Sequence, residues 1–275
     1  MSDATRGSTV DTFGTAQTVR ADDGVDIAFR VHGAGRRPVT LLHSLGLDGS
    51  WFESLVTAMG SDYQFIVPDL RGHGRSATGE VSLGRVAADV ITVLDACDAR
   101  SSAVFGISMG GMVAQVLAAS YPERVDALCL AATTYGYDEP AIAGALARAA
   151  EARNGMAPIA AATVARWFGP ADEVPQRLLP QARRAEQQLL AGSATVHADY
   201  LAAMTQVGEF AVPVGTPTLV LGGRDDLSTG SAVIERLAGS IPGAELHFVP
   251  GGHLMAFTDP ESVAAHLRDF LDCLD

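Results

Sequence analysis

The chain has 275 residues, of which 48% are hydrophobic and 19% charged, and 19 Lys and Arg against 32 Asp and Glu give a net charge of −13. This length fits one domain with a large buried core and a substantial insertion. An acidic surface repels phosphate backbones and anionic lipid, and no window has the roughly 18 apolar residues of a membrane span. We therefore expect neither nucleic-acid nor membrane partners.

Residues 1–20 are polar and lack the basic start and apolar stretch of a secretory signal. We expect a cytoplasmic protein in which residues 1–20 form a flexible extension. Cys97, Cys129 and Cys273 are odd in number and lack C-x-x-C spacing, which is typical of a reducing compartment. The seven histidines are scattered without an H-x-x-x-H pair, so we expect neither a metal nor another cofactor.

Short apolar runs alternate with longer helix-period runs through the first half of the chain. The pattern predicts strands at 25–31, 39–42, 64–67, 103–107 and 127–131, and helices at 50–59, 83–97 and 109–120. Several of these strands are almost entirely apolar. Such an alternation indicates an α/β fold with a mostly parallel central sheet and helices on both faces.

The pattern changes between residues 134 and 210, which are rich in Ala, Arg, Gln and Leu at helical spacing and contain no convincing strand. The alternation then resumes with a strand at 217–221, a helix at 230–238, a strand at 245–249 and a final helix at 260–274. We interpret 134–210 as a helical cap inserted into an α/β core formed by 1–133 and 211–275. A separate second domain is the alternative, but it would leave two incomplete sheet fragments.

Gly106-Ile107-Ser108-Met109-Gly110 follows a predicted strand and precedes a predicted helix. In this setting G-x-S-x-G forms a sharp turn that exposes a nucleophilic serine, and its glycines let neighbouring backbone pass without Cβ clashes. The first N–H groups of the helix then face any oxyanion that forms beside Ser108. The alternative is a glycine-rich turn with an incidental serine.

Two later strand ends supply a carboxylate and an imidazole. Asp225 and Asp226 follow the strand at 217–221, and His253 follows the strand at 245–249 after two glycines. Parallel strands carry functional residues at their carboxyl ends, and Ser, Asp, His is the chain order of triads that use this serine turn. The sequence therefore predicts a triad of Ser108, His253 and one of the two aspartates. A histidine that only caps a turn is the alternative.

The turn after the strand at 39–42 is the candidate source of a second N–H donor for an oxyanion hole. It reads His43-Ser44-Leu45-Gly46, and we expect the backbone N–H groups of Leu45 and Met109 to share the oxyanion. Ordinary turn residues at His43 and Ser44 are the alternative, and we interpret His43 as a structural, hydrogen-bonding histidine.

Four segments resemble the α/β-hydrolase superfamily and together span residues 41 to 253. Within it the chain is most similar to 3-oxoadipate enol-lactonases, which share a Ser-Leu-Gly followed by an Asp and an aromatic residue, here Asp48 and Trp51. They also share an Arg-Trp-Phe in the cap, here Arg166-Trp167-Phe168. The four segments are Leu41-Leu42-His43-Ser44-Leu45-Gly46, Pro68-Asp69-Leu70-Arg71-Gly72-His73-Gly74-Arg75-Ser76, Gly106-Ile107-Ser108-Met109-Gly110-Gly111 and Gly251-Gly252-His253.

The resemblance implies that Ser108 is the nucleophile and His253 the base. It places the acid three residues after the last glycine of its strand, which selects Asp226, whereas counting from Gly222 selects Asp225. It also implies structural roles for Arg71 and His73. The chain departs from the family at Thr229-Gly230, where a Pro or a similar residue usually follows the acid loop.

The implied activity is hydrolysis of a small ester or lactone through an acyl-enzyme, of the EC 3.1.1 type, in the catabolism of aromatic compounds. A carboxylate on the substrate would meet Arg166, with Ser44 and Trp167 as further substrate contacts, whereas packing within the cap and a solvated arginine are the alternatives. Rival functions are a general carboxylesterase, a carbon–carbon bond hydrolase and, from another class, a hydrolase-derived ligand receptor. Dehalogenases and epoxide hydrolases are disfavoured because they place Asp where this chain has Ser108. The oligomeric state stays open.

Overall fold

The computed structural model describes residues 14–274. Its centre is an eight-stranded sheet with the order β1-β2-β4-β3-β5-β6-β7-β8. Strands β3 to β8 run parallel, and β2 is antiparallel to both β1 and β4. The strands are β1 (Gln17–Arg20), β2 (Asp26–His32), β3 (Arg37–Leu42), β4 (Tyr63–Pro68), β5 (Ser102–Ile107), β6 (Val125–Ala131), β7 (Thr218–Gly223) and β8 (Glu245–Val249).

The inner strands are buried along almost their whole length, as their apolar sequences predict. Every residue of β5 and of β7 is buried, whereas the edge strands β1 and β8 keep most of their residues at least partly exposed. Sheets covered on both faces require such continuous apolar strands. The predicted site residues therefore follow strands that are held rigidly in the core.

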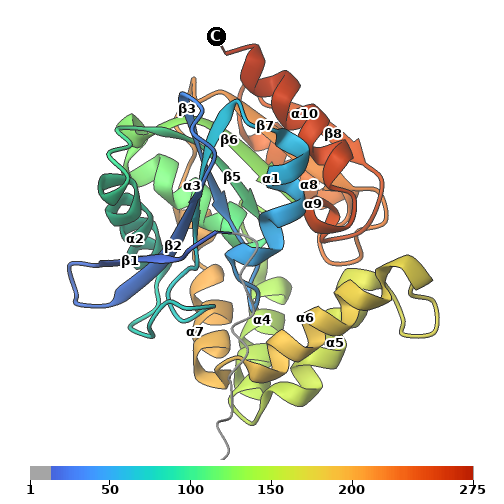
Figure 1. Cartoon of the computed structure of the whole chain (residues 1–275). Coiled ribbons are helices and arrows are strands. Elements are labelled where there is room, and N and C mark those ends of the chain that lie inside the picture. Colours follow the sequence, from blue (N-terminus) through green and yellow to red (C-terminus); the bar gives the residue numbers. More distant parts are fainter. Residues whose placement is uncertain (1–13, 275) are drawn as a thin grey trace, which may run out of the picture.

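Helices cover both faces of this sheet (Figure 1). Helix α2 packs against α3 on one face, and α1 packs against α10 on the other, while α8 packs on β7. These helices are α1 (Glu53–Met59), α2 (Leu83–Ala96), α3 (Met109–Ser120), α8 (Ser231–Ser240), α9 (Met255–Thr258) and α10 (Pro260–Asp272).

Between β6 and β7 the described chain forms four α-helices, two short 3₁₀ helices and no strand. Helix α4 packs on α7, and α5 packs on α6 and α4. Figure 1 shows the four together at one end of the sheet. They are α4 (Glu139–Ala152), α5 (Met156–Phe168), α6 (Leu179–Ala191) and α7 (Ala194–Met204), and we call them the cap helices.

The predicted fold class is confirmed, and all seven predicted strands are present with ends that differ by at most two residues. The helix predicted at 50–59 begins instead as a 3₁₀ turn over Gly49–Phe52, because the Asp48 side chain accepts the Ser50 N–H at 2.9 Å and caps it there.

The expected flexible extension over 1–20 is wrong for its last residues, and residues 1–13 lie outside the described part. Gln17–Arg20 forms β1, which pairs with β2. Val19 packs on a small buried cluster that includes Ile27 and Leu94. This contact explains why a short polar segment is ordered into a strand.

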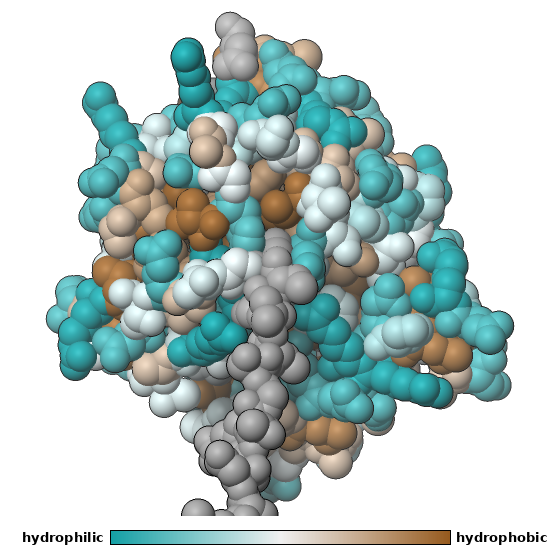
Figure 2. Space-filling model, in the orientation of Figure 1, coloured by the Kyte–Doolittle hydropathy of each residue, from teal (hydrophilic) through white to brown (hydrophobic). Residues whose placement is uncertain are grey.

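The face shown in Figure 2 is mostly hydrophilic or intermediate, with hydrophobic residues in small separate patches. Within residues 14–274, no helix combines the length and apolar character needed to cross a bilayer. The same residues contain no group of three or more His, Cys, Asp or Glu side chains arranged to hold a metal ion.

Candidate active site

Ser108 occupies the sharp turn between β5 and α3. Its backbone has φ of +55° and ψ of −118°, a conformation that residues other than glycine rarely adopt. The turn is held because the Ser108 N–H donates to the Ala131 carbonyl at 2.9 Å and the Thr133 hydroxyl donates to the Ser108 carbonyl at 2.7 Å. The serine side chain is thus presented at the carboxyl end of the central strand.

The two glycines of the motif are required by close backbone contacts. A Cβ on Gly106 would lie 2.3 Å from the Gly110 carbonyl oxygen, and a Cβ on Gly110 would lie 2.0 Å from the Leu42 carbonyl oxygen. Neither separation is possible for real atoms. Glycine at both positions therefore lets β3, β5 and the start of α3 meet.

Three predicted residues form one hydrogen-bonded chain. His253 Nε2 lies 2.9 Å from Ser108 Oγ, and His253 Nδ1 lies 2.9 Å from Asp226 Oδ2. His253 and Asp226 are 2% and 6% exposed, so bulk water does not compete for these bonds. Asp225, the alternative acid, is exposed and lies outside this chain.

The loop after β7 holds the Asp226 carboxylate from several sides. The backbone N–H groups of Ser228 and Thr229 donate to Oδ1 at 2.7 and 3.0 Å, and the Thr229 hydroxyl donates to Oδ2 at 2.6 Å. Burial raises the pKa of Asp226, but the bonds from His253 and Thr229 outweigh burial and hold the pKa below its ordinary value. The carboxylate is therefore ionised beside the imidazole.

The predicted oxyanion donors are free to bind a substrate oxygen. Within residues 14–274 the N–H groups of Leu45 and Met109 have no hydrogen-bond acceptor. His43 Nε2 accepts the Leu70 N–H at 2.9 Å, so its Nδ1 carries the hydrogen and donates to the Ser44 carbonyl at 2.9 Å. Because the peptide bond is planar and trans, this contact directs the Leu45 N–H away from His43.

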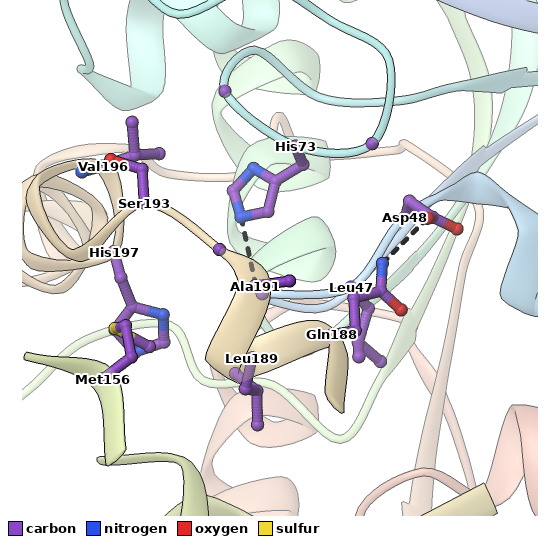
Figure 3. A pocket seen from close by; sticks show the side chains of 14 residues that line it. Leu47, Asp48, His73, Met156, Gln188, Leu189, Ala191, Ser193, Val196 and His197 are labelled. Atoms are coloured by element: carbon purple, nitrogen blue, oxygen red, sulfur yellow. Dashed lines mark hydrogen bonds between the residues drawn. The ribbon is translucent and has the colours of Figure 1, made fainter. Parts of the chain in front are cut away.

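A second histidine, His73, contacts the loop that follows β3. It borders a second cavity, of about 300 Å³, between this loop and the cap helices (Figure 3). His73 Nε2 accepts the Gly46 N–H at 3.0 Å. Burial lowers the pKa of His43, and burial with the nearby His43 lowers the pKa of His73 to about 3. The predicted structural roles of His43 and His73 agree with these contacts.

Ser108 and His253 open onto another cavity of about 250 Å³, which we call the triad cavity. Trp167 from α5 lies almost parallel to the His253 ring, with centroids 6.1 Å apart and planes at 13°. Trp167 therefore forms part of the cavity wall. Ser44 also borders the triad cavity, but its side chain is fully buried and its Oγ has no hydrogen-bond partner in the described chain.

Three arginines from different helices line the triad cavity: Arg148 on α4, Arg166 on α5 and Arg236 on α8. Within residues 14–274, none of them has a carboxylate within 4.0 Å, and Arg166 donates instead to the Thr163 hydroxyl at 3.0 Å. Burial and then the charge of Arg148 lower the pKa of Arg166. Arg148 and Arg166 are half-buried, whereas Arg236 is exposed, and Asp138 is the one described carboxylate among the residues that line the cavity. Half-buried arginines without an ion-pair partner are suited to an anionic ligand.

Sequence reasoning missed Arg148, Arg236, Thr229 and His197, all of which line the triad cavity. Arg148, Arg236 and His197 lie on separate helices, and only tertiary packing brings them together. Thr229 could have been noticed in the sequence, since it lies only three residues after Asp226. His197 is 6% exposed, and burial together with the charges of Arg166 and Arg148 lowers its pKa to about 4.

Comparison with known proteins identifies this architecture. The chain belongs to the family with the alpha/beta hydrolase fold, whose family model matches residues 37–260. It is similar to 3-oxoadipate enol-lactonase 2 of Acinetobacter baylyi, at 28% identity over 252 residues, with 89% of this chain and 92% of the relative covered.

Poly(3-hydroxyalkanoate) depolymerase of Ectopseudomonas oleovorans is 29% identical over 247 residues, with 85% of this chain and 84% of the relative covered. The crystal structure of the enol-lactonase from Burkholderia xenovorans LB400 matches with a TM-score of 0.84 at 25% identity, covering 93% of this chain and 100% of that one. These comparisons confirm the predicted superfamily, the resemblance to enol-lactonases and the class of ester- or lactone-bond hydrolases.

Proposed function

We propose that the protein is a serine hydrolase that cleaves a small carboxylic ester or lactone through an acyl-enzyme. The observation that carries this proposal is the continuous hydrogen-bonded chain from Ser108 Oγ through His253 to the buried Asp226 carboxylate. In the proposal Ser108 is the nucleophile, His253 the general base and then the general acid, and Asp226 the residue that orients the imidazole.

In the first half of the reaction, His253 Nε2 takes the Ser108 proton while Oγ attacks the carbonyl carbon. The resulting oxyanion accepts hydrogen bonds from the Leu45 and Met109 N–H groups, helped by the dipole of α3. His253 then gives the proton to the leaving oxygen, which in a lactone stays attached as an alcohol or enol. In the second half, water activated by His253 attacks the acyl-enzyme and frees Ser108.

The cavity favours a substrate that carries a carboxylate. Arg148 and Arg166 lie close enough for the charge of Arg148 to lower the pKa of Arg166, and no described carboxylate lies within 4.0 Å of either, although Asp138 lines the same cavity. An anionic substrate would supply the missing counter-charge, and Trp167 would cover its apolar part. Together with the enol-lactonase relatives, these contacts favour an enol-lactone with a carboxylate side chain, and cytoplasmic catabolism of aromatic compounds as its setting.

We also propose that residues 134–210 act as the lid of this site, with 1–133 and 211–275 as the hydrolase core. Arg148, Arg166 and His197 reach the triad cavity from the cap helices, whereas Ser108, Asp226 and His253 come from loops at the ends of the sheet strands. Substrate choice would then depend on the cap and the chemistry on the core.

The test compares wild-type protein and Ser108→Ala on p-nitrophenyl acetate, small lactones and an enol-lactone with a carboxylate. By analogy with measured triads, Ser108→Ala should reduce kcat by about 10⁴ to 10⁶. Undiminished hydrolysis by Ser108→Ala would refute the mechanism. Preference for p-nitrophenyl acetate over every lactone would indicate a general esterase instead.

Arginine variants test the substrate class. Arg148→Ala and Arg166→Ala should each raise KM about tenfold or more for the carboxylated lactone, because each loses a charge-assisted contact of about 1.5 kcal/mol or more. Arg183→Ala, an exposed cap arginine outside the triad cavity, is the matched control. An equal effect of all three variants would argue against a specific carboxylate contact.

A further inference from the structure

Thr229 lies beside the Asp226–His253 pair and is not one of the three triad residues. Its Oγ1 is 2.6 Å from Asp226 Oδ2 and 3.1 Å from His253 Nδ1. The carboxylate oxygen that faces His253 therefore also faces Thr229. The side chain is half-buried and borders the triad cavity, so it stands between that cavity and the carboxylate.

The hydrogens in this arrangement can be placed from chemistry. An ionised carboxylate has no hydrogen to donate, so the Thr229 hydroxyl gives its single hydrogen to Asp226. Only lone pairs of Oγ1 then face His253 Nδ1, which must carry the hydrogen between the two acceptors. With Nδ1 protonated, Nε2 of the neutral ring is left to accept the Ser108 proton.

We propose that Thr229 is a positioning residue that holds His253 in its Nδ1–H tautomer and sets the lower pH limit of activity by moderating the charge of Asp226. This inference rests on the proposed serine-hydrolase function. The contact bears on protonation because Asp226 stabilises the imidazolium form of His253, and a donor on the same oxygen weakens that support.

Two effects of the Thr229 hydroxyl oppose each other. Its hydrogen bond to Asp226 withdraws charge from Oδ2, which favours the neutral imidazole, whereas its lone pairs favour the protonated ring. The first contact is shorter, at 2.6 Å against 3.1 Å, and it involves a formal charge. The net effect of Thr229 is therefore to keep His253 neutral at lower pH.

Other charged groups around the site do not reproduce this contact. Asp225 is exposed, and the cavity is lined by Asp138, Arg148, Arg166, His197 and Arg236, none of which has a direct contact with His253 in the described chain. Burial and the charges of Arg166 and Arg148 lower the pKa of His197 to about 4, so this ring is neutral near pH 7. Burial raises the pKa of the Tyr137 phenol to about 12, so it is neutral as well.

The experiment compares Thr229→Val, which keeps the shape and removes the hydroxyl, with Thr229→Ser, which keeps the hydroxyl. The acidic limb of kcat/KM for p-nitrophenyl acetate should move up by about half a pH unit in Thr229→Val, the effect of one ordinary hydrogen bond. Thr229→Ser should restore the wild-type limb. Thr258→Val, whose hydroxyl donates to Leu254 outside the triad, is the matched control and should leave the limb unchanged.

A second measurement works without turnover. In uniformly labelled protein, the ¹⁵N and ¹H resonances of the His253 ring report its pKa and tautomer directly, and the Thr229→Val and Thr229→Ala proteins should show the same upward shift. A His253 pKa that is unchanged or lowered in both Thr229→Val and Thr229→Ala would overturn the inference. Absence of Ser108-dependent hydrolysis in the wild type would instead overturn the proposed function and leave the titration to decide the role of Thr229.

Discussion

The contact between Gly110 and β3 gives a direct test of the proposed oxyanion hole. In Gly110→Ala the new Cβ would start 2.0 Å from the Leu42 carbonyl oxygen and 2.8 Å from that of His43. To reach an ordinary contact near 3.4 Å, α3 and the end of β3 must separate by about 1.4 Å. Met109 lies at the start of α3 and Leu45 follows β3, so the separation would pull the two N–H donors apart.

The expected loss follows from that displacement. Removing one oxyanion donor costs about 10² to 10³ in kcat, and overpacking costs about 1 to 3 kcal/mol of unfolding free energy. Steady-state hydrolysis of p-nitrophenyl acetate and urea denaturation measure the two effects. In the control Gly239→Ala the Cβ meets no atom within 4 Å on α8, so the gain in helix propensity should stabilise the protein by about 0.5 to 1 kcal/mol. A Gly110→Ala protein with wild-type kcat would refute the reasoning.

Three further predictions concern stability, thiol reactivity and the cap. In the folded protein the pKa of His73 is lowered to about 3, so the ring stays neutral down to about that pH, whereas in the unfolded chain it takes up a proton below about pH 6.5. Acid therefore favours unfolding. The unfolding free energy should therefore fall by up to about 1.4 kcal/mol per pH unit from this histidine between those values, and His73→Asn should reduce the slope seen in urea titrations at pH 7, 5.5 and 4.5. Cys273 is exposed whereas Cys129 is buried and its pKa is raised by burial, so Ellman's reagent should reach Cys129 only on unfolding; equal rates would contradict the structure. Gln188 on α6 bonds Trp51 Nε1 at 2.7 Å and Asp48 Oδ2 at 2.8 Å, so Gln188→Ala should speed proteolysis within the cap helices, and an unchanged digestion rate would show that these bonds do not anchor them.

The main elements of the fold could be predicted because the inner strands are short, apolar and separated by helical periodicity. Strand β1 escaped prediction since its Gln-Thr-Val-Arg sequence lies at an edge and only Val19 packs inward. The order of the strands also could not be read from periodicity, because it depends on which crossovers the chain makes. Sequence spacing likewise left two candidates for the acid, Asp225 and Asp226. The loop geometry distinguishes them, because only Asp226 is buried and hydrogen-bonded to His253.

The residues of the proposed triad and the proposed oxyanion donors could be named from the sequence because each follows a strand and carries a local motif. The cavity walls could not, since Arg148, Arg166, His197 and Arg236 are far apart in sequence and carry no local motif together. Their convergence depends on how α4, α5, α7 and α8 pack around the triad. The residues to which we assign the chemistry are therefore easier to find in a sequence than those to which we assign substrate choice.

The position of His253 after the edge strand β8 has a consequence for the newborn protein. Ribosomes release the chain from its amino end, so the serine turn and Leu45 emerge long before residue 253. A nascent chain folded only through β7 would hold the proposed nucleophile and both proposed oxyanion donors without the proposed base. If the proposed mechanism holds, hydrolysis would begin only when β8 has paired with β7 and brought His253 to Ser108, so the onset of activity would report completion of the sheet.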